Sequence, residues 1–468
     1  QFDVVTYTGN GGTQQIGGPV YSNFASGATY SNLPNTNAFD GSTSTVSGPQ
    51  NSTVTWTPSP AIAVSSSLRI FVAKNGTGSV FSVNGTDYSS STTEPGTWLT
   101  ISGVTSLTEV KWGGSGYNMN QVAAIEVDGT ILVDGHGGPG LKFQPDLIWL
   151  KARGSAFAHV LQDSVRGFGS TKLLSSSSTA EENRLTDPTD GGERGYISGT
   201  SSTGFTIVDG TGTSQVNGNN ETYVAWCWKA GGTAVSNTDG SITASVSANA
   251  AYGFSIVSFT GTGANATVGH GLNTAPKFVM AKTRTKNDGW PVYHSGGGSN
   301  YQFFINQTDA GTGGTSYFNG APTSSVVNLG NNSGSNESGE PCLLYCFADV
   351  PGYQRIGTYY SNSSDPVVVT GFKPRFLLTK KTSAGPWTLH DSQRDFDDDD
   401  NRTTLEANNS NAEETHANKQ VKFLDNGFQL IGADMDKSAT DWIYWAIGDD
   451  EIGSDEDCLV DVPNAVTA

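Results

Sequence analysis

Short apolar runs separated by turn residues recur along the whole chain. The runs at 147–150, 278–281 and 376–378 are examples, and Gly, Pro, Ser, Thr and Asn are frequent between such runs. Strands are typically about four to eight residues long, so this pattern favours β-strands over helices. No Leu/Ala/Glu/Lys periodicity typical of helical bundles or coiled coils is sustained anywhere. The chain is therefore predicted to be all-β.

One sequence skeleton occurs three times. In each copy a proline precedes an apolar run that ends in a lysine, at 145 and 151, 276 and 282, and 374 and 380. An Asp-Ser or His-Ser pair begins 12, 12 and 11 positions after that lysine, at 163, 294 and 391. Agreement at two independent distances predicts three copies of one structural unit.

Each copy also has an opening strand and a closing strand with aromatic residues. The opening strands begin at residues 2, 254 and 353, and the closing runs span 223–228, 343–347 and 442–447. In the closing runs Cys227, Cys346 and Ala446 align as one column of small residues, so both cysteines are interpreted as buried thiols. The same interpretation is given to Cys342 and Cys458. Each copy is predicted to be a small antiparallel β-sandwich.

The first copy contains a long insertion. Its opening aromatic residue and its proline lie at 2 and 145, whereas the pairs in the other copies lie at 254 and 276 and at 353 and 374. A loop accepts such an insertion because the entropy cost of closing a loop grows only slowly with its length. The predicted fold is therefore multi-domain, with three tandem antiparallel β-sandwich repeats and a further module inserted in the first. The predicted boundaries are 1–18 plus 136–235 for the first repeat, 19–135 for the insertion, 236–350 and 351–450 for the other repeats, and 451–468 for a C-terminal extension or linker.

Charge and composition exclude some partners. The chain has 25 Lys and Arg against 44 Asp and Glu, a formal charge of −19, and the basic residues form no cluster. This argues against nucleic acid as a partner. No apolar run approaches the roughly 18 residues that a membrane-spanning helix needs, so no membrane insertion is expected.

The inserted segment resembles a known module. It opens with Asn-Ala-Phe-Asp-Gly-Ser-Thr-Ser-Thr at 37–45 and continues with several strands. It resembles the galactose-binding-like (discoidin-type) jelly rolls, whose opening carries Ala-x-Asp-Gly-x-x-x-Thr. In that family the loop often binds calcium, and the matching positions here are Asp40, Thr45 and Glu126. The resemblance therefore implies a calcium site, with a plain Asp-Gly turn as the alternative. No other cofactor is expected.

Two copies carry the motif Asp-Ser-x-Arg, at Asp163 and Arg166 and at Asp391 and Arg394. A catalytic serine would need a histidine base at a fixed offset, but the nearby histidines lie at different offsets in the two copies. We interpret the motif as structural, with the aspartate capping a turn and pairing with the arginine. The chain is not expected to be an enzyme.

Two further features have alternative interpretations. Trp112, Trp290 and Trp387 lie in Gly- and Ser-rich surroundings, where they could be sugar-stacking platforms, but core positions are favoured. The acidic run at 395–400 is interpreted as a solvated loop, with weak calcium binding as the alternative.

With the repeat in view, residues 2–18 and about 136–450 resemble tail-fibre-type structural proteins of marine bacteriophages. The Asp-Ser-x-Arg motifs carry most of that resemblance. It implies a virion surface protein that is a tail fibre or adhesin. Its expected partners are other virion proteins and a host cell-surface glycan, the latter bound by rim loops of the inserted module without catalysis. A homotrimer is expected by analogy with phage fibres. The alternatives are a capsid decoration or head-fibre protein and a polysaccharide depolymerase, which would need two carboxylates across a sugar site.

Overall fold

A computed structural model describes residues 1–448 apart from several short segments. The segments outside the description are 19–20, 28, 32, 40–41, 50–51, 60, 76–78, 93–95, 116–117, 133–140, 183–193, 213–214, 362–365, 395–399, 402, 417–418 and 432–439, together with 449–468. Across the described residues the ladders between strands are antiparallel, and the α-helical structure is one turn, α1 (Ser333–Asn336). The predicted all-β fold is confirmed. None of the helical turns in these residues is long and apolar enough to cross a membrane.

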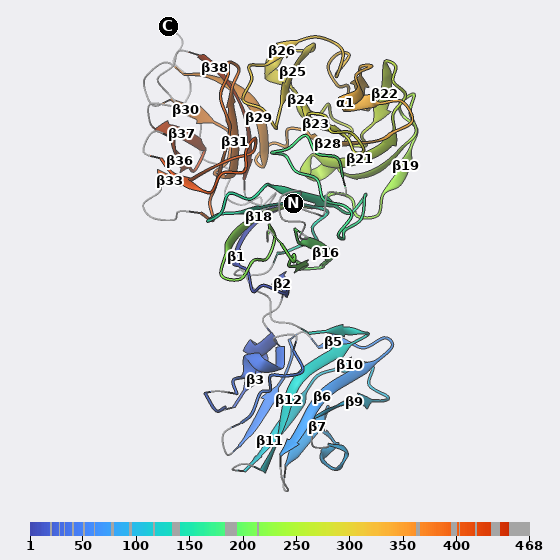
Figure 1. The fold of residues 1–468 in the computed structure, drawn as a ribbon, viewed down its shortest axis with the longest axis vertical. Coiled ribbons are helices and arrows are strands. Elements are labelled where there is room, and N and C mark those ends of the chain that lie inside the picture. The colour runs from blue at the N-terminus through green and yellow to red at the C-terminus, as the bar shows by residue number, and fades with distance from the viewer. Residues whose placement is uncertain are drawn as a thin grey trace, which may run out of the picture. The chain divides into compact units, whose positions relative to one another are not determined.

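The chain divides into two compact units (Figure 1). One contains Gln1–Thr13 and Leu141–Ala468, and the other contains Gln14–Gly140. The second unit begins and ends within about five residues of the predicted insertion, 19–135. The two units are described separately below.

In the Gln14–Gly140 unit, the main sheet has the strand order β3-β4-β11-β12-β6-β9. Its core contains Trp56, Ile70, Trp112 and Ile125, each fully buried. The main strands are β3 (Ala25–Ser26), β4 (Thr53–Trp56), β6 (Leu68–Asn75), β9 (Thr97–Ile101), β11 (Val110–Ser115) and β12 (Asn118–Val127). Shorter elements are η1 (Tyr21–Phe24), η2 (Asn35–Phe39), β5 (Ile62–Ala63), β7 (Val80–Val83), β8 (Thr86–Asp87), η3 (Ser89–Ser91), β10 (Ser106–Leu107) and β13 (Thr130–Ile131).

In the other unit each repeat contributes one inner sheet, and four strands of each sheet follow the same order. These four strands are the whole sheet in the first repeat and part of an eight-stranded and a six-stranded sheet in the second and third. The orders are β1-β18-β14-β15, β21-β28-β23-β24 and β29-β38-β31-β32, so the opening, closing, proline-led and Asp/His-Ser strands correspond in all three. The strands of the first two repeats are β1 (Phe2–Thr8), β14 (Leu147–Ala152), β15 (Val160–Asp163), β18 (Thr222–Trp228), β21 (Phe254–Thr260), β23 (Phe278–Thr283), β24 (Pro291–His294) and β28 (Pro341–Phe347). Those of the third are β29 (Gln354–Ser361), β31 (Pro374–Lys381), β32 (Trp387–Asp391) and β38 (Thr440–Gly448).

The proline-led and closing strands of the inner sheets are buried on both faces, and one face of each sheet contributes to a single shared core. The shared cluster includes Phe2 and Trp228 from the first repeat, Phe347 from the second, and Phe376 and Trp445 from the third. The ring centroids of Trp445 lie 5.7 Å from Trp228 and 4.1 Å from Phe347. We expected each repeat to bury its own core; instead the three inner sheets cover one another.

The second face of the inner sheets is covered within each repeat. In the second repeat β22 (Ala266–Gly269) and β27 (Val326–Leu329) pair, and their residues join an outer core with Val279 and Cys346. In the third repeat β36 (Gln420–Leu424) and β37 (Gly427–Ile431) cover Leu377 and Ala446. The remaining strands are β2 (Thr13–Gly17), β16 (Tyr196–Ser201), β17 (Gly204–Val208), β19 (Val235–Asn237), β20 (Ala244–Asn249), β25 (Tyr301–Phe304), β26 (Thr312–Gly313), β30 (Val367–Val369), β33 (Asp400–Asn401), β34 (Thr403–Glu406) and β35 (Glu414–Thr415), with η4 (Ala250–Tyr252) and η5 (Ser295–Gly297).

The predicted column of small residues lies in these outer cores. Cys227 pairs with Ile148, and Cys346 with Val279, each on the neighbouring proline-led strand, and Ala446 occupies the same place in the third repeat. Cys227, Cys342 and Cys346 are buried and free. Cys458 and most of the acidic run at 395–400 lie outside the described residues.

A glycine allows close packing at the edge of the third repeat. Gly427 has a φ of 154°, and a Cβ atom there would lie 2.0 Å from the carbonyl oxygen of Val368 on the paired strand β30. Any side chain would push that strand away. The β36–β37 hairpin itself turns at residues 425–426, between the paired Leu424 and Gly427, so the glycine is needed for the contact with β30.

Replacing Trp445 by Ala tests whether the shared core stabilises the whole repeat unit. Trp445 is about 1% exposed, and truncating such a side chain leaves a cavity. We expect a loss of about 3–5 kcal/mol in the free energy of unfolding, measured with urea. Val235→Ala, at a position 66% exposed, should change it by less than about 0.5 kcal/mol. Equal effects of the two variants would contradict the shared core.

Candidate functional site

The two Asp-Ser-x-Arg motifs fold alike. Asp163 ends β15, and its Oδ1 accepts hydrogen bonds from the backbone N–H groups of Val165 and Arg166, at 3.0 and 2.9 Å. Its Oδ2 accepts from Arg166 Nε at 2.5 Å, and both side chains are 0% exposed. Asp391 and Arg394 repeat this geometry, with Nε to Oδ2 at 2.6 Å. Each aspartate therefore caps a turn and holds its own arginine.

Both ion pairs extend into a neighbouring repeat. Arg166 Nη1 donates to Glu182 Oε1 at 2.9 Å. The other oxygen of that carboxylate accepts a hydrogen bond at 2.6 Å from Nε of Arg284, which belongs to the second repeat. Tyr345 of the second repeat donates its hydroxyl to Asp163 Oδ2 at 2.7 Å. The first and second repeats are thus joined by a buried polar network, which we call the first junction.

The third repeat contacts the first in the same way. The Glu413 carboxylate accepts hydrogen bonds from Arg394 Nη1 at 3.0 Å and from Nε of Arg153, in the first repeat, at 2.6 Å. Trp226 Nε1 donates to Asp391 Oδ2 at 3.0 Å, in the position that the Tyr345 hydroxyl takes in the first junction. No chain connection directly links the third repeat to the first, so this third junction closes the ring of sheets through side chains and backbone hydrogen bonds.

In the second junction, between the second and third repeats, no described residue forms the corresponding ion pair. His294 stands at the aspartate position, opposite Phe278, and its Nε2 lies 3.2 Å from the carbonyl oxygen of Tyr444. One backbone hydrogen bond nevertheless recurs in all three junctions. The N–H groups of Glu182, Gly311 and Glu413 donate to the carbonyl oxygens of Arg284, Thr382 and Arg153, at 2.6, 3.0 and 2.7 Å. Gly311 and Thr382 therefore occupy the Glu and Arg positions of the other junctions.

The repeated lysines are buried beside the junctions. Lys282 Nζ donates to the carbonyl oxygens of Lys286 and Asp288 and, across the first junction, to that of Thr179. Lys380 makes the corresponding bond to Thr308 across the second junction. Burial lowers the pKa of Lys151, Lys282 and Lys380 to about 8. Each ammonium group is therefore used to satisfy loop carbonyls.

Buried histidines are likewise engaged by the fold. His159 Nδ1 accepts from Trp149 Nε1 at 2.8 Å, and its Nε2 lies 3.0 Å from the carbonyl oxygen of Glu406 in the third repeat. These partners fix the neutral form with the proton on Nε2. Burial lowers the pKa of His159 and His390 to about 3 and that of His294 to about 4.

This arrangement is unsuited to catalysis by the motif serine. Ser164 Oγ donates to Asp146 Oδ1 at 2.7 Å, while His159 bonds elsewhere. Burial raises the pKa of Tyr345 well above its ordinary value, so its hydroxyl stays protonated. The motif's ionic groups are enclosed by protein, and a substrate has no access to them.

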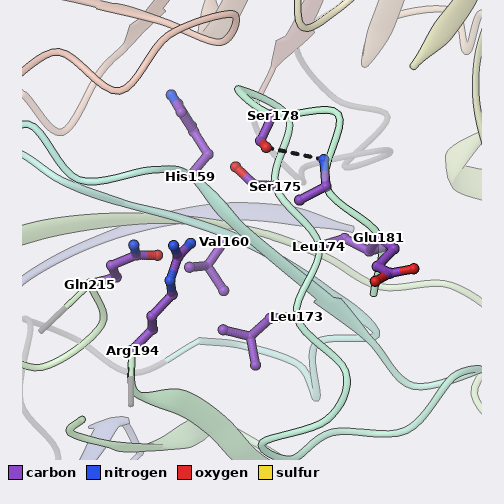
Figure 2. Close-up of a pocket in the computed structure, with 10 residues that line it drawn as sticks. His159, Val160, Leu173, Leu174, Ser175, Ser178, Glu181, Arg194 and Gln215 are labelled. Carbon is purple, nitrogen blue, oxygen red and sulfur yellow. Dashed lines mark hydrogen bonds between the residues drawn. The ribbon is translucent and has the colours of Figure 1, made fainter. Parts of the chain in front are cut away.

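A small hollow in the first repeat lies near the first junction, and Ala180 and Glu181 are among the residues that line it (Figure 2). Arg194 and Gln215 lie on one side of it in this view and Glu181 on the other. The hydroxyl groups of Ser175 and Ser178 are hydrogen-bonded to Ser177 Oγ and to the N–H of Ala180. Within the described residues the hollow therefore presents no paired nucleophile and base.

The residues predicted to bind calcium are placed only in part. Glu126 is about 6% exposed and forms two hydrogen bonds with Arg69, Thr45 is exposed, and Asp40 lies outside the described residues. A calcium ion would have to share Glu126 with the Arg69 guanidinium. Across the described part of the chain, no cluster of three or more His, Cys, Asp or Glu side chains could hold a metal ion. The calcium site stays a prediction.

Trp112, Trp290 and Trp387 are buried core residues, each at most about 1% exposed, as the favoured interpretation predicts. They cannot serve as sugar platforms on the surface. The partners from neighbouring repeats, by contrast, were not identified from the sequence. Arg153 and Arg284 both lie two positions after the repeated lysine, and this shared spacing was a signal that could have identified them.

Removing Arg394 tests the structural role of the motif. Arg394→Ala would leave Asp391 buried without its cation and would leave Glu413 with Arg153 alone. We expect a loss of about 3–5 kcal/mol in the free energy of unfolding. Lys373→Ala is the control, because Lys373 and its partner Asp425 are 58% and 100% exposed. It should change stability by less than about 0.5 kcal/mol in the same urea titration. A small effect of Arg394→Ala would exclude the structural role.

The buried histidines predict a pH dependence. Unfolded histidine takes up a proton near pH 6.5, whereas His159 in the folded chain does so only near its pKa of about 3. The contribution of each neutral, buried histidine to the free energy of unfolding is therefore fully present above pH 6.5. It is lost as the pH falls from 6.5 toward the folded pKa of about 3, and the loss is about 2 kcal/mol per histidine at pH 5. His159→Gln should reduce the fall in unfolding free energy between pH 7 and pH 5. An unchanged slope would show that His159 titrates normally.

Comparison with known proteins gives one match. The model of a family described as a domain of unknown function (DUF7483) matches residues 129–450, which include all of the second and third repeats and most of the first. Neither a curated protein nor a solved structure matches the chain. Because the match covers more than half of the chain, the protein belongs to the DUF7483 family, whose function is unknown.

Proposed function

We propose that this protein is a non-catalytic attachment protein on the surface of a virus particle, of the tail-fibre type, and that it binds host glycans. One observation carries the proposal. The motif that most resembles catalytic chemistry, Asp-Ser-x-Arg, has its Asp and Arg side chains 0% exposed in both copies, within the junctions between repeats. A motif used twice for packing suits a scaffold better than an active site.

The architecture fits display of a binding surface. Three inner sheets that share one core form a rigid body, and rigid scaffolds commonly present binding residues on their loops. Those loops are rich in Ser, Thr and Asn, whose side chains offer adaptable hydrogen bonds to sugar hydroxyl groups. The sequence resemblance to phage fibre proteins supplies the viral context.

A second candidate function is capsid decoration, in which the protein binds the viral shell. It is favoured by exposed apolar residues on β30 of the third repeat, where Val367 and Val369 are 56% and 63% exposed. β30 pairs on one side with β37, and an apolar edge strand of this kind can pair with another protein. Electron cryo-microscopy of the source particle separates the two functions by the position of the chain on tail or capsid.

The non-catalytic assignment predicts binding without cleavage. The whole chain, incubated with purified host capsular polysaccharide, should co-sediment with it and release no reducing ends above the buffer control. A known depolymerase of that polysaccharide is the positive control. Release of reducing ends above the buffer control by the wild-type chain would exclude the proposal.

A further inference from the structure

One face of the main sheet in the Gln14–Gly140 unit carries an ordered group of polar and aromatic side chains. Along β6 the side chains of Ile70 and Val72 point into the core, and those of Arg69 and Phe71 lie on the opposite face. This alternation follows from the two-residue period of a strand. The outward face is therefore separate from the core and from the loops at the ends of the sheet.

The strand register gathers four side chains on this face. Arg69 lies opposite Glu126 of β12, and Phe71 lies opposite Trp98 of the edge strand β9. Phe71 and Trp98 are half-buried, and their ring centroids are 5.6 Å apart at an interplanar angle of 87°. The Arg69 guanidinium carbon lies 4.9 Å from the centre of the Trp98 ring. The four residues form one continuous patch, which we call the Arg69–Trp98 face.

Glu126 holds the guanidinium in a fixed orientation. Arg69 Nε and Nη2 donate to Glu126 Oε1 and Oε2 at 2.7 and 2.5 Å, a two-point contact along one edge of the guanidinium. The Glu126 side chain is 8% exposed, whereas that of Arg69 is 41% exposed. The carboxylate is thus buried beneath a cation that reaches solvent.

Among the described residues, Glu126 is the hydrogen-bond partner of Arg69, and it uses one edge of the guanidinium. A guanidinium group has five N–H donors, and the Glu126 contact uses one on Nε and one on Nη2. One hydrogen of Nη1 and the other hydrogen of Nη2 form a second fork, which suits a pair of adjacent oxygen atoms. The guanidinium lies over part of the Trp98 ring, and this ring is half-buried. The part of the ring that stays exposed is an apolar surface of the kind that the C–H face of a sugar covers.

We propose that the Arg69–Trp98 face binds a saccharide. The sugar ring lies against the exposed part of Trp98, and two of its oxygens accept hydrogen bonds from the second fork of Arg69. Those oxygens are either neighbouring hydroxyl groups of a neutral sugar or the carboxylate of an acidic one. The inference rests on the proposed glycan-binding function and places the contact on the sheet, whereas the sequence led us to expect the rim loops.

A glycan array tests this site with the whole chain. The array carries neutral oligosaccharides and oligosaccharides that contain uronic or sialic acids, and the two sets distinguish hydroxyl from carboxylate recognition. The strongest ligand is then titrated by calorimetry into the wild type and into Trp98→Ala and Arg69→Lys. Arg69→Lys keeps the positive charge but removes both forks. Each variant should weaken binding at least tenfold.

The control is Lys111→Ala, which removes a cation from β11 of the same unit and should leave affinity unchanged. Thermal melting of each variant shows whether the unit remains folded. A glycan that binds all variants equally would overturn the Arg69–Trp98 face and leave the proposed function standing. Failure of the wild type to bind any glycan on the array would overturn both.

Discussion

The structure depends on one constraint. The inner sheets of the three repeats are apolar on both faces, so other parts of the protein must shield each face from water. Within a repeat the outer strands cover only one face. The other is covered when three such sheets meet around the cluster that contains Trp228, Phe347 and Trp445. Because burial of apolar surface is the main favourable term in folding, one repeat alone would expose its inner face to water. The repeat is therefore a unit of sequence, while the set of three is the unit of folding.

The junctions between repeats contain the Asp and Arg residues of the repeated Asp-Ser-x-Arg motif. Apolar packing is non-directional, whereas a buried ion pair with every group bonded tolerates only one arrangement. Asp163 with Arg166 and Asp391 with Arg394 supply that geometry where the first repeat meets the second and where the third meets the first. The second junction keeps the shared backbone bond, from Gly311 to Thr382, and replaces the ions with His294. Its two repeats are already joined by the short connection between β28 and β29, so orientation there depends less on charge.

Much of the fold could be predicted from spacing alone. The fixed distance from proline to lysine located the strands β14, β23 and β31, and the long gap in the first copy located the insertion. The shared core could not be predicted, because a strand that is apolar on both faces has the same pattern in a separate sandwich and in a shared one. Spacing alone marks Arg153 and Arg284 as equivalent residues, but it does not show that they contact Glu413 and Glu182, which lie about a hundred or more positions away. The Arg69–Glu126 pair shows a further limit, because a carboxylate that fits a calcium motif can equally serve an arginine on the next strand.

The central claim is that the three repeats fold as one body, and native-state hydrogen exchange of the whole chain tests it most directly. The closing strands β18, β28 and β38 lie inside the three inner sheets, one per repeat. The account predicts that the most protected amides of all three strands exchange through the same global opening. Their opening free energies would then agree within about 1 kcal/mol and fall together as denaturant is added. Three distinct opening free energies, each with its own denaturant dependence, would show three independent sandwiches and would contradict the account.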